Sequence, residues 1–135
     1  MEVSRFCLDT SAYSRFRRGD ADVARLIDEA EWIGVPAVVL GELRVGFRLG
    51  GQAERNETLL REFIANPAVQ VLPVDGDVSH QYADIAIELR RAGTPIPTND
   101  MWIAATAASA GAIVLTTDDH FSVVGRVGSV VLSDA

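Results

Sequence analysis

The stretch TPIPTNDMWIAATAASAGAIVLTTDDHF, residues 94–121, has the pattern of a loop, a helix, a strand and an acidic turn in succession. Its small residues, AATAASAG, are typical of a helix that lies close to a sheet, and the apolar residues 112–115 predict a short buried strand. A buried strand cannot hold unpaired carboxylates in its middle, because their desolvation is costly. The stretch therefore predicts that Asp100 and Asp118 lie beyond the C-terminal end of that strand.

Short apolar runs recur along the chain, separated by segments with helical spacing. They predict strands at residues 3–8, 34–37, 69–74, 112–115 and 128–132, in the order β-α-α-β-α-α-β-α-α-β-β. This order predicts a three-layer α/β fold, with a mainly parallel five-stranded sheet and helices on both faces. Pro73 predicts an edge position or the last residue of its strand. Asp77 is expected to cap a helix at residues 78–91.

Length, composition and charge set limits on the whole protein. The 135 residues fit one domain, residues 1–135, and no apolar run approaches the roughly 18 residues of a membrane span. The N-terminus lacks a signal-peptide pattern, and the single cysteine, Cys7, lies in an apolar run that favours burial; both indicate a cytoplasmic protein. The net charge of −7 argues against a surface coated in positive charge, although a metal site could hold part of the acidity.

Two further acids are expected at the same edge of the sheet. Asp9 directly follows the first predicted strand, and Glu42 lies in the first turns of a helix predicted at residues 38–48. Ligands of such sheets bind beyond the C-terminal strand ends, at the point where the strand order reverses. Four carboxylates that are far apart in the sequence could therefore converge there.

Each of these acids also has a purely structural interpretation. The alternatives are helix capping for Asp9 and Asp100, a solvated turn for Asp118, and ion pairing with Arg44 or Arg48 for Glu42. Partly buried acids in one cleft repel one another unless a positive charge joins them. All twelve basic residues are arginine, so no lysine can take that place and a divalent cation is the natural candidate.

An all-carboxylate ligand set favours Mg²⁺ or Mn²⁺ over zinc. No His/Cys cluster is present, and His80 and His120 are expected to be structural or solvated. A carboxylate-bound Mg²⁺ can orient a water, lower its pKa and stabilise charge on a phosphodiester. The hydroxyls of Ser11 and Thr116 could hydrogen-bond that water or a ligand.

Several other classes of phosphate-handling protein are excluded by the same residues. Response-regulator receivers and haloacid-dehalogenase phosphatases need a lysine, and the chain has none. The motifs GxGxxG and GxxxxGK[ST] are also absent, so nucleotide-binding loops are not predicted.

Three segments together resemble one known family. They are FCLDTSAY at residues 6–13, VVLGELRVG at residues 38–46 and TNDMWIAATAASAGAIVLTTDDHF at residues 98–121. In this order and spacing they are similar to the motifs of PIN-domain ribonucleases, and specifically of VapC-type toxins from type II toxin–antitoxin systems. The resemblance covers essentially the whole chain.

The resemblance implies an enzyme and assigns its residues. The family's acidic quartet falls on Asp9, Glu42, Asp100 and Asp118 as catalytic residues and metal ligands, with Ser11 and Thr116 as its catalytic hydroxyls. It implies one or two Mg²⁺ or Mn²⁺ ions and an endoribonuclease that hydrolyses RNA phosphodiesters with a metal-activated water. The implied substrate is tRNA or rRNA. Asp118, rather than its neighbour Asp119, is the ligand that the motif selects.

The resemblance also implies protein partners. A VapB-like antitoxin would lay its C-terminal segment in a groove between early helices, for which Tyr13, Phe16, Leu43 and Phe47 are candidates; equally, these residues could be core. Arg15, Arg17, Arg18, Arg44 and Arg48 could contact RNA phosphates or acidic antitoxin residues. A homodimer or a toxin–antitoxin hetero-oligomer is expected.

Two other functions remain open at the level of sequence. One is a catalytically inactive PIN-like module that binds RNA or metal as a regulator, against which the intact quartet argues. The other is a structural α/β domain whose acids only cap helices. Measured binding of Mg²⁺ or Mn²⁺ would exclude the second, and RNA cleavage would exclude both.

Overall fold

The computed structural model describes residues 5–133. Its five-stranded sheet has the order β3-β2-β1-β4-β5, and every neighbouring pair of strands is parallel. The strands are β1 (Arg5–Leu8), β2 (Trp32–Pro36), β3 (Val69–Leu72), β4 (Ile113–Thr116) and β5 (Ser129–Val131). The predicted sheet is confirmed, although residues 3 and 4 of the first predicted strand lie outside the described part of the chain.

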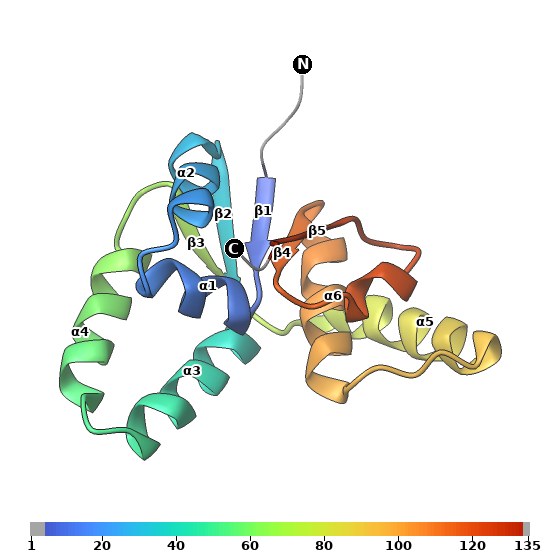
Figure 1. Ribbon diagram of the computed structural model, residues 1–135. Helices are drawn as coiled ribbons and strands as arrows, with labels where there is room; N and C mark the ends of the chain where they lie inside the picture. The colour runs from blue at the N-terminus through green and yellow to red at the C-terminus, as the bar shows by residue number, and fades with distance from the viewer. Residues whose placement is uncertain (1–4, 134–135) are drawn as a thin grey trace.

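Helices cover both faces of this sheet, as predicted. They are α1 (Thr10–Arg17), α2 (Ala21–Glu29), α3 (Ala37–Leu49), α4 (Ala53–Ile64), α5 (Gly76–Ala92), α6 (Thr98–Ala110) and the 3-10 helix η1 (His120–Val123). Figure 1 shows α1 and α2 on one side of the sheet and α5 and α6 on the other, while α3 and α4 form a separate hairpin. The short helix η1 between β4 and β5 is a feature that the sequence did not predict.

Local signals explain where most helices begin and end. Asp9 and Asp20 cap α1 and α2 with their side chains, whereas α5 is capped by Asp75, which accepts a hydrogen bond from the Val78 N–H at 3.0 Å. The prediction of Asp77 as this cap was wrong by two residues, because the helix starts at Gly76. Gly93 and Gly111 end α5 and α6 with positive φ angles of 70° and 65°, which glycine adopts without strain.

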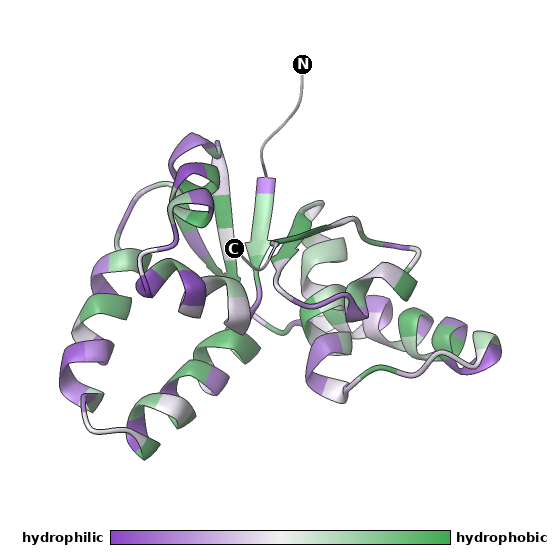
Figure 2. Cartoon of the chain, in the orientation of Figure 1, coloured by the Kyte–Doolittle hydropathy of each residue, from purple (hydrophilic) through white to green (hydrophobic). Residues whose placement is uncertain are grey.

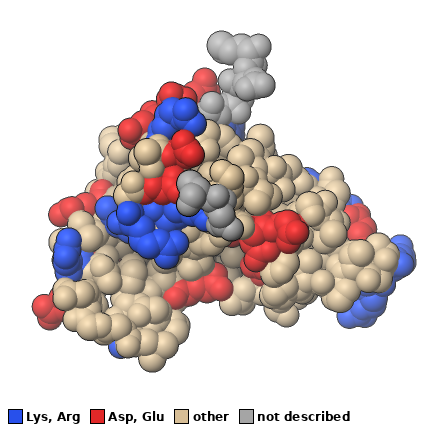
Figure 3. Space-filling view, viewed as in Figure 1, with Lys and Arg blue, Asp and Glu red and all other residues tan. Residues whose placement is uncertain are grey.

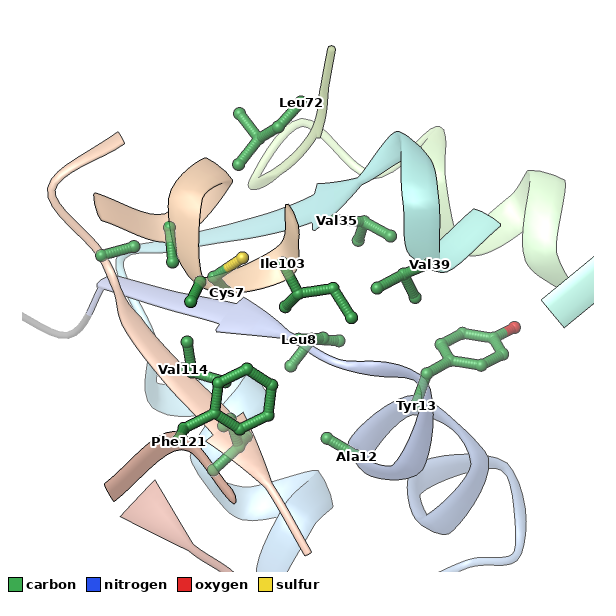
Figure 4. Close-up of a cluster of buried hydrophobic side chains, with 14 of the residues drawn as sticks. Cys7, Leu8, Ala12, Tyr13, Val35, Val39, Leu72, Ile103, Val114 and Phe121 are labelled. Atoms are coloured by element: carbon green, nitrogen blue, oxygen red, sulfur yellow. The ribbon is translucent and has the colours of Figure 1, made fainter. Parts of the chain in front are cut away.

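The core lies between α6 and the sheet and between the sheet and α1. Five consecutive residues of α6, Ile103, Ala104, Ala105, Thr106 and Ala107, are buried. Their small side chains let the helix approach the strands closely, as the sequence predicted. Figure 4 shows side chains from β1, β4 and α6 in one cluster, including Leu8, Val114 and Ile103, and Figure 2 shows polar residues on the outer helices. Cys7 is fully buried, and burial raises the pKa of its thiol, which favours an inert side chain.

The strand order defines where a ligand site is expected. From β1 the chain proceeds to β2 and then β3 on one side, but β4 and β5 lie on the other side of β1. The order therefore reverses between β1 and β4, and the residues that follow these two strands are Asp9 and Thr117. The predicted edge position of the Pro73 strand is confirmed, although β3 ends at Leu72 and Pro73 lies just after it. None of the helices in residues 5–133 is both long and apolar enough to span a membrane.

Candidate active site

The inner part of the candidate site is built around Asp9, between β1 and α1. This residue is 5% exposed, and its Oδ1 accepts hydrogen bonds from the Ala12 N–H at 2.9 Å and the Ser11 hydroxyl at 2.7 Å. Its Oδ2 accepts a third from the hydroxyl of Thr116, the fully buried last residue of β4. We refer to Asp9, Ser11 and Thr116 as the inner network. The Asp9 carboxylate thus caps a helix and also joins the ends of two neighbouring strands.

The inner network also fixes the turn after β4. Ser11 Oγ accepts a hydrogen bond from the Thr117 N–H at 3.0 Å, and Thr116 Oγ1 accepts one from the Asp118 N–H at 2.9 Å. The hydroxyl that donates to Asp9 therefore also accepts from the backbone of Asp118. Because one hydroxyl serves both residues, the positions of Asp9 and Asp118 are coupled.

The outer part of the site holds Asp100, Asp118 and His120, which we call the outer cluster. Nδ1 of His120 lies 3.0 Å from Oδ2 of Asp100 and 3.1 Å from Oδ2 of Asp118. The side chain of His120 is 43% exposed, that of Asp118 is 39% exposed and that of Asp100 is 21% exposed. Asp118 is held further by its Oδ1, which accepts a hydrogen bond from the His120 N–H at 3.0 Å. The outer cluster thus joins the start of α6 to the start of η1 at a surface that solvent reaches.

Glu42, on α3, stands at the rim of the site. Its Oε1 accepts a hydrogen bond from the Thr10 hydroxyl at 2.6 Å, and its Oε2 accepts one from the Asn99 amide at 3.2 Å. Thr10 follows Asp9 and Asn99 precedes Asp100, so both partners flank other acids of the site. The fold therefore brings Glu42 beside the residues with which the sequence grouped it.

Two pKa shifts follow from this arrangement. Burial raises the pKa of Asp9, hydrogen bonds from Thr116, Ser11 and Ala12 act in the opposite direction, and repulsion from Asp100 raises it further. The pKa of His120 is raised, chiefly by its hydrogen bond to Asp100, and also by the negative charges of Asp118, Asp100 and Asp119. The pKa shift of Asp9 thus reflects mainly burial, whereas the pKa shift of His120 reflects the carboxylates that surround its ring.

The donor atoms fit a hard divalent cation. One oxygen each from Asp100 and Asp118 and one nitrogen of His120 lie within 4.8 Å of one another. A carboxylate oxygen has about two lone pairs. Among the described residues, Asp9 Oδ1 accepts two hydrogen bonds and Oδ2 accepts one, which leaves a lone pair for one further bond. Oxygen-rich donor sets of this kind suit Mg²⁺ or Mn²⁺.

Two residues have contacts that the sequence did not predict. His120, which was expected to be structural or solvated, is 43% exposed, and its ring lies between two of the predicted ligands. The spacing Asp118-x-His120 was the available signal, because a tight turn can return such a ring to the carboxylate. One interpretation of Glu42 was an ion pair with Arg44 or Arg48. In the structure Arg44 instead forms a bidentate ion pair with Glu57 on α4. The hydrogen bonds of Glu42 are instead made with Thr10 and Asn99, which are neighbours of site residues.

Comparison with known proteins shows the family to which the chain belongs. Residues 6–127 match the profile of the PIN domain. Ribonuclease VapC5 of Mycobacterium tuberculosis is 33% identical over 126 residues, which cover 91% of this chain and 90% of that protein. The chain belongs to the VapC ribonuclease family of PIN-domain proteins. Ribonuclease VapC4 of the same organism is 34% identical over 122 residues, covering 90% of this chain and 92% of VapC4.

Solved structures of VapBC complexes share the fold. The structure of DNA-bound VapBC from Salmonella typhimurium includes a chain that matches with a TM-score of 0.80 and 26% identity, over 93% of this chain and 96% of that chain. In the present VapC protein, the inner network, the outer cluster and Glu42 lie together beyond the C-terminal ends of the sheet strands.

A cavity on the surface of the protein lies between α1, α3 and α4. This cavity of about 200 Å³ is lined by residues of α1, α3 and α4: Tyr13, Ser14, Arg17, Arg18, Leu43, Phe47, Asn56 and Leu59. Three of the four residues predicted for a groove line it, although Tyr13 and Leu43 are themselves 1% and 5% exposed and belong to the core. Phe16 instead packs against Phe63, with ring centroids 5.3 Å apart. The two interpretations of these residues, groove and core, therefore both apply.

Proposed function

We propose that the protein is a Mg²⁺- or Mn²⁺-dependent endoribonuclease, the toxin of a toxin–antitoxin pair. The single observation that carries this proposal is the convergence of Asp9, Asp100 and Asp118 at the β1–β4 switch point, with Glu42 beside them. When bound, the metal would supply a Lewis acid for hydrolysis of a phosphodiester. Asp9, Glu42, Asp100 and Asp118 are the proposed metal-binding and catalytic residues.

The chain's own residues have distinct proposed tasks. Asp9 is held by three hydrogen bonds and keeps a lone pair on Oδ2 for one further bond. Ser11 and Thr116 keep the Asp9 carboxylate in one orientation, and Thr116 also fixes the backbone of Asp118. Because the inner network needs no rearrangement, it presents a preorganised negative site to a cation.

RNA would approach across the exposed outer cluster. Figure 3 shows basic side chains gathered over α1, beside the acidic groups of the site. Arg17 and Arg18 are exposed near the end of α1, about 12 Å along the helix from Asp9. Guanidinium groups bind phosphate well, so they are the proposed contacts for the RNA backbone on one side of the scissile bond. Structured RNA of the tRNA or rRNA class is the proposed substrate.

Purified protein should cleave RNA in the presence of Mg²⁺ or Mn²⁺ and lose that activity in EDTA. Asp9→Asn keeps the shape of the side chain but removes its charge, so cleavage should fall to background. Total tRNA and ribosomal RNA would be the substrates, with primer extension to locate the cuts. Cleavage that persists in Asp9→Asn would assign the activity to a contaminant or to another site.

The alternative is an inactive PIN-like module that binds RNA or metal without turnover. The specific observation in its favour is that His120 already occupies a position between Asp100 and Asp118. Tight RNA binding without cleavage under Mg²⁺, Mn²⁺ and other divalent ions would support this alternative. Cleavage at a defined site that depends on Asp9 would exclude it.

The proposed partner is a VapB-like antitoxin, as in the VapBC complexes whose toxin chains share this fold. The cavity between α1, α3 and α4 combines apolar walls with Arg17 and Arg18, which suits a segment that carries both apolar and acidic residues. If a short reading frame neighbours the gene, co-expression with it followed by light scattering would identify the complex. It would also distinguish a homodimer from a hetero-oligomer.

A further inference from the structure

The ring of His120 lies between the carboxylates of Asp100 and Asp118. Its Nδ1 is 3.0 Å from one carboxylate oxygen of Asp100 and 3.1 Å from one of Asp118. Its neighbour Phe121 is 1% exposed, so burial of that ring anchors the start of η1 and with it the position of His120. The His120 N–H is bound by Asp118 Oδ1, which leaves Asp118 Oδ2 to face the ring.

The two equal distances have a specific geometric meaning. Adjacent ligands of an octahedral ion with bonds of about 2.1 Å lie about 3.0 Å apart. A single N–H, in contrast, points at one of the two oxygens or is shared between them with poorer angles to both. Two oxygens at 3.0 and 3.1 Å from Nδ1 therefore fit the spacing of neighbouring ligands around one ion, and all three donor atoms lie within 4.8 Å of one another.

We propose that His120, through Nδ1, is a ligand of the metal ion that Asp100 and Asp118 bind, and that it makes the site select Mn²⁺ over Mg²⁺. The inference rests on the metal dependence proposed above. Mg²⁺ prefers oxygen ligands and gains little from imidazole, whereas affinity for nitrogen donors rises along the first transition row from Mn²⁺ onward. A site with two carboxylates and one imidazole is thus better matched to a transition metal.

A different role of the ring makes the opposite prediction. If His120 only donates a hydrogen bond to the two aspartates, it competes with the metal for their oxygens. Removal of the ring would then strengthen metal binding, whereas removal of a ligand weakens it. The sign of the change in affinity therefore decides between the two roles.

The test is calorimetric titration of the full chain with Mn²⁺ alone and with Mg²⁺ alone. His120→Ala should weaken Mn²⁺ binding roughly tenfold or more, the range seen when groups close to a metal are lost, and should change Mg²⁺ binding much less. His80→Ala is the matched control, since the other histidine lies exposed on α5, and it should leave both affinities unchanged. His120→Asn serves as a second variant, and a thermal melt of each protein verifies folding.

Pulsed electron paramagnetic resonance of bound Mn²⁺ gives a direct second readout. Coupling to a histidine nitrogen should be present in wild type and in His80→Ala and absent in His120→Ala. Unchanged or tighter Mn²⁺ binding by His120→Ala, while Asp118→Asn loses binding, would overturn this inference and leave the metal site intact. Unchanged binding by Asp118→Asn as well would overturn the proposed metal site itself.

Discussion

The inner network and the outer cluster hold acids of the same site in opposite environments. Asp9 is buried and accepts three hydrogen bonds from its own fold, whereas Asp100 and Asp118 are partly exposed and share one histidine ring. The inner acid is therefore fixed before any ligand arrives, and the outer acids face the place from which ligand and substrate come. The site combines one preorganised charge with two that can exchange partners.

The largest effect is expected from Asp9→Asn, which removes the charge of the inner network. Cleavage of RNA should fall roughly 100-fold or more. The substitution removes several kcal/mol of charge stabilisation, and about 1.4 kcal/mol corresponds to a factor of ten in rate. The free energy of unfolding of the metal-free protein should increase at neutral pH. Asparagine caps helices as well as aspartate does, so the fold keeps its N-cap.

The sign of the stability change follows from the raised pKa of Asp9. With a folded-state pKa above the unfolded one, the stabilising contribution is complete below the unfolded pKa and is lost as pH rises through the folded pKa. At neutral pH the metal-free wild type therefore carries a buried charge that Asp9→Asn lacks. The variant should melt at a higher temperature in EDTA at neutral pH, and the difference should shrink in acid. A variant that melts lower at neutral pH would contradict this account.

Thr116→Val tests the coupling between the two halves of the site. Valine has the shape of threonine but neither donates to Asp9 nor accepts from the Asp118 N–H. Loss of these buried hydrogen bonds should cost about 1–3 kcal/mol in the free energy of unfolding and should also lower cleavage. Thr117→Val is the control, because Thr117 contributes its backbone N–H to the network. Equal effects at both positions would show that the coupling is not specific to Thr116.

Much of this arrangement could be predicted from sequence because it depends on chain order. Asp9 and Asp118 follow short apolar strands, and a parallel sheet with reversed strand order brings such strand ends together. The small residues of α6 likewise predicted close packing on the sheet. These inferences need only the succession of strands and helices, which the hydrophobic pattern records.

The contacts of His120 and Glu42 could not be predicted in the same way. The ring of His120 reaches the aspartates because η1 turns the chain directly after Asp118, and one 3-10 turn leaves little periodicity in a sequence. Glu42 accepts from Thr10 and Asn99, which are 32 and 57 residues away. Arginines on its own helix were the nearer partners in sequence, but α4 supplies Glu57 to Arg44. Tertiary contacts overrode local spacing at both positions.

Thr10→Val should have a smaller effect, since it touches the site through Glu42. The substitution removes the 2.6 Å hydrogen bond to Glu42 Oε1 and leaves the Asn99 contact in place. This hydrogen bond is only partly buried and solvent can replace part of it, so its loss should cost less than loss of the Thr116 hydrogen bonds. We expect cleavage to fall by less than in Thr116→Val, with the affinity for RNA unchanged. Kinetics with Glu42→Gln alongside would show whether both variants act on one step.

The smallest effect is expected at Glu57, which belongs to neither half. Arg44 donates to Glu57 at 3.0 and 2.9 Å and lowers the pKa of that carboxyl. The stability that this pair contributes is therefore present above the unfolded-state pKa of glutamate and is lost as pH falls through the lower folded-state value. Glu57→Gln should lower the melting temperature slightly at neutral pH, and the difference should vanish in acid.

Glu57→Gln also tests whether the α3–α4 hairpin affects metal binding at the site. A ligand that binds only the folded state adds a free energy of RT ln(1 + [L]/Kd) to its stability, whatever the starting stability. Added Mn²⁺ should thus raise the melting temperature of Glu57→Gln and of wild type equally, while Asp118→Asn should show little rise. Glu42 lies on the same helix as Arg44, so a reduced rise in Glu57→Gln would mean that the hairpin sets the position of Glu42. In that case the preorganised part of the site would extend beyond the inner network to α3 and α4.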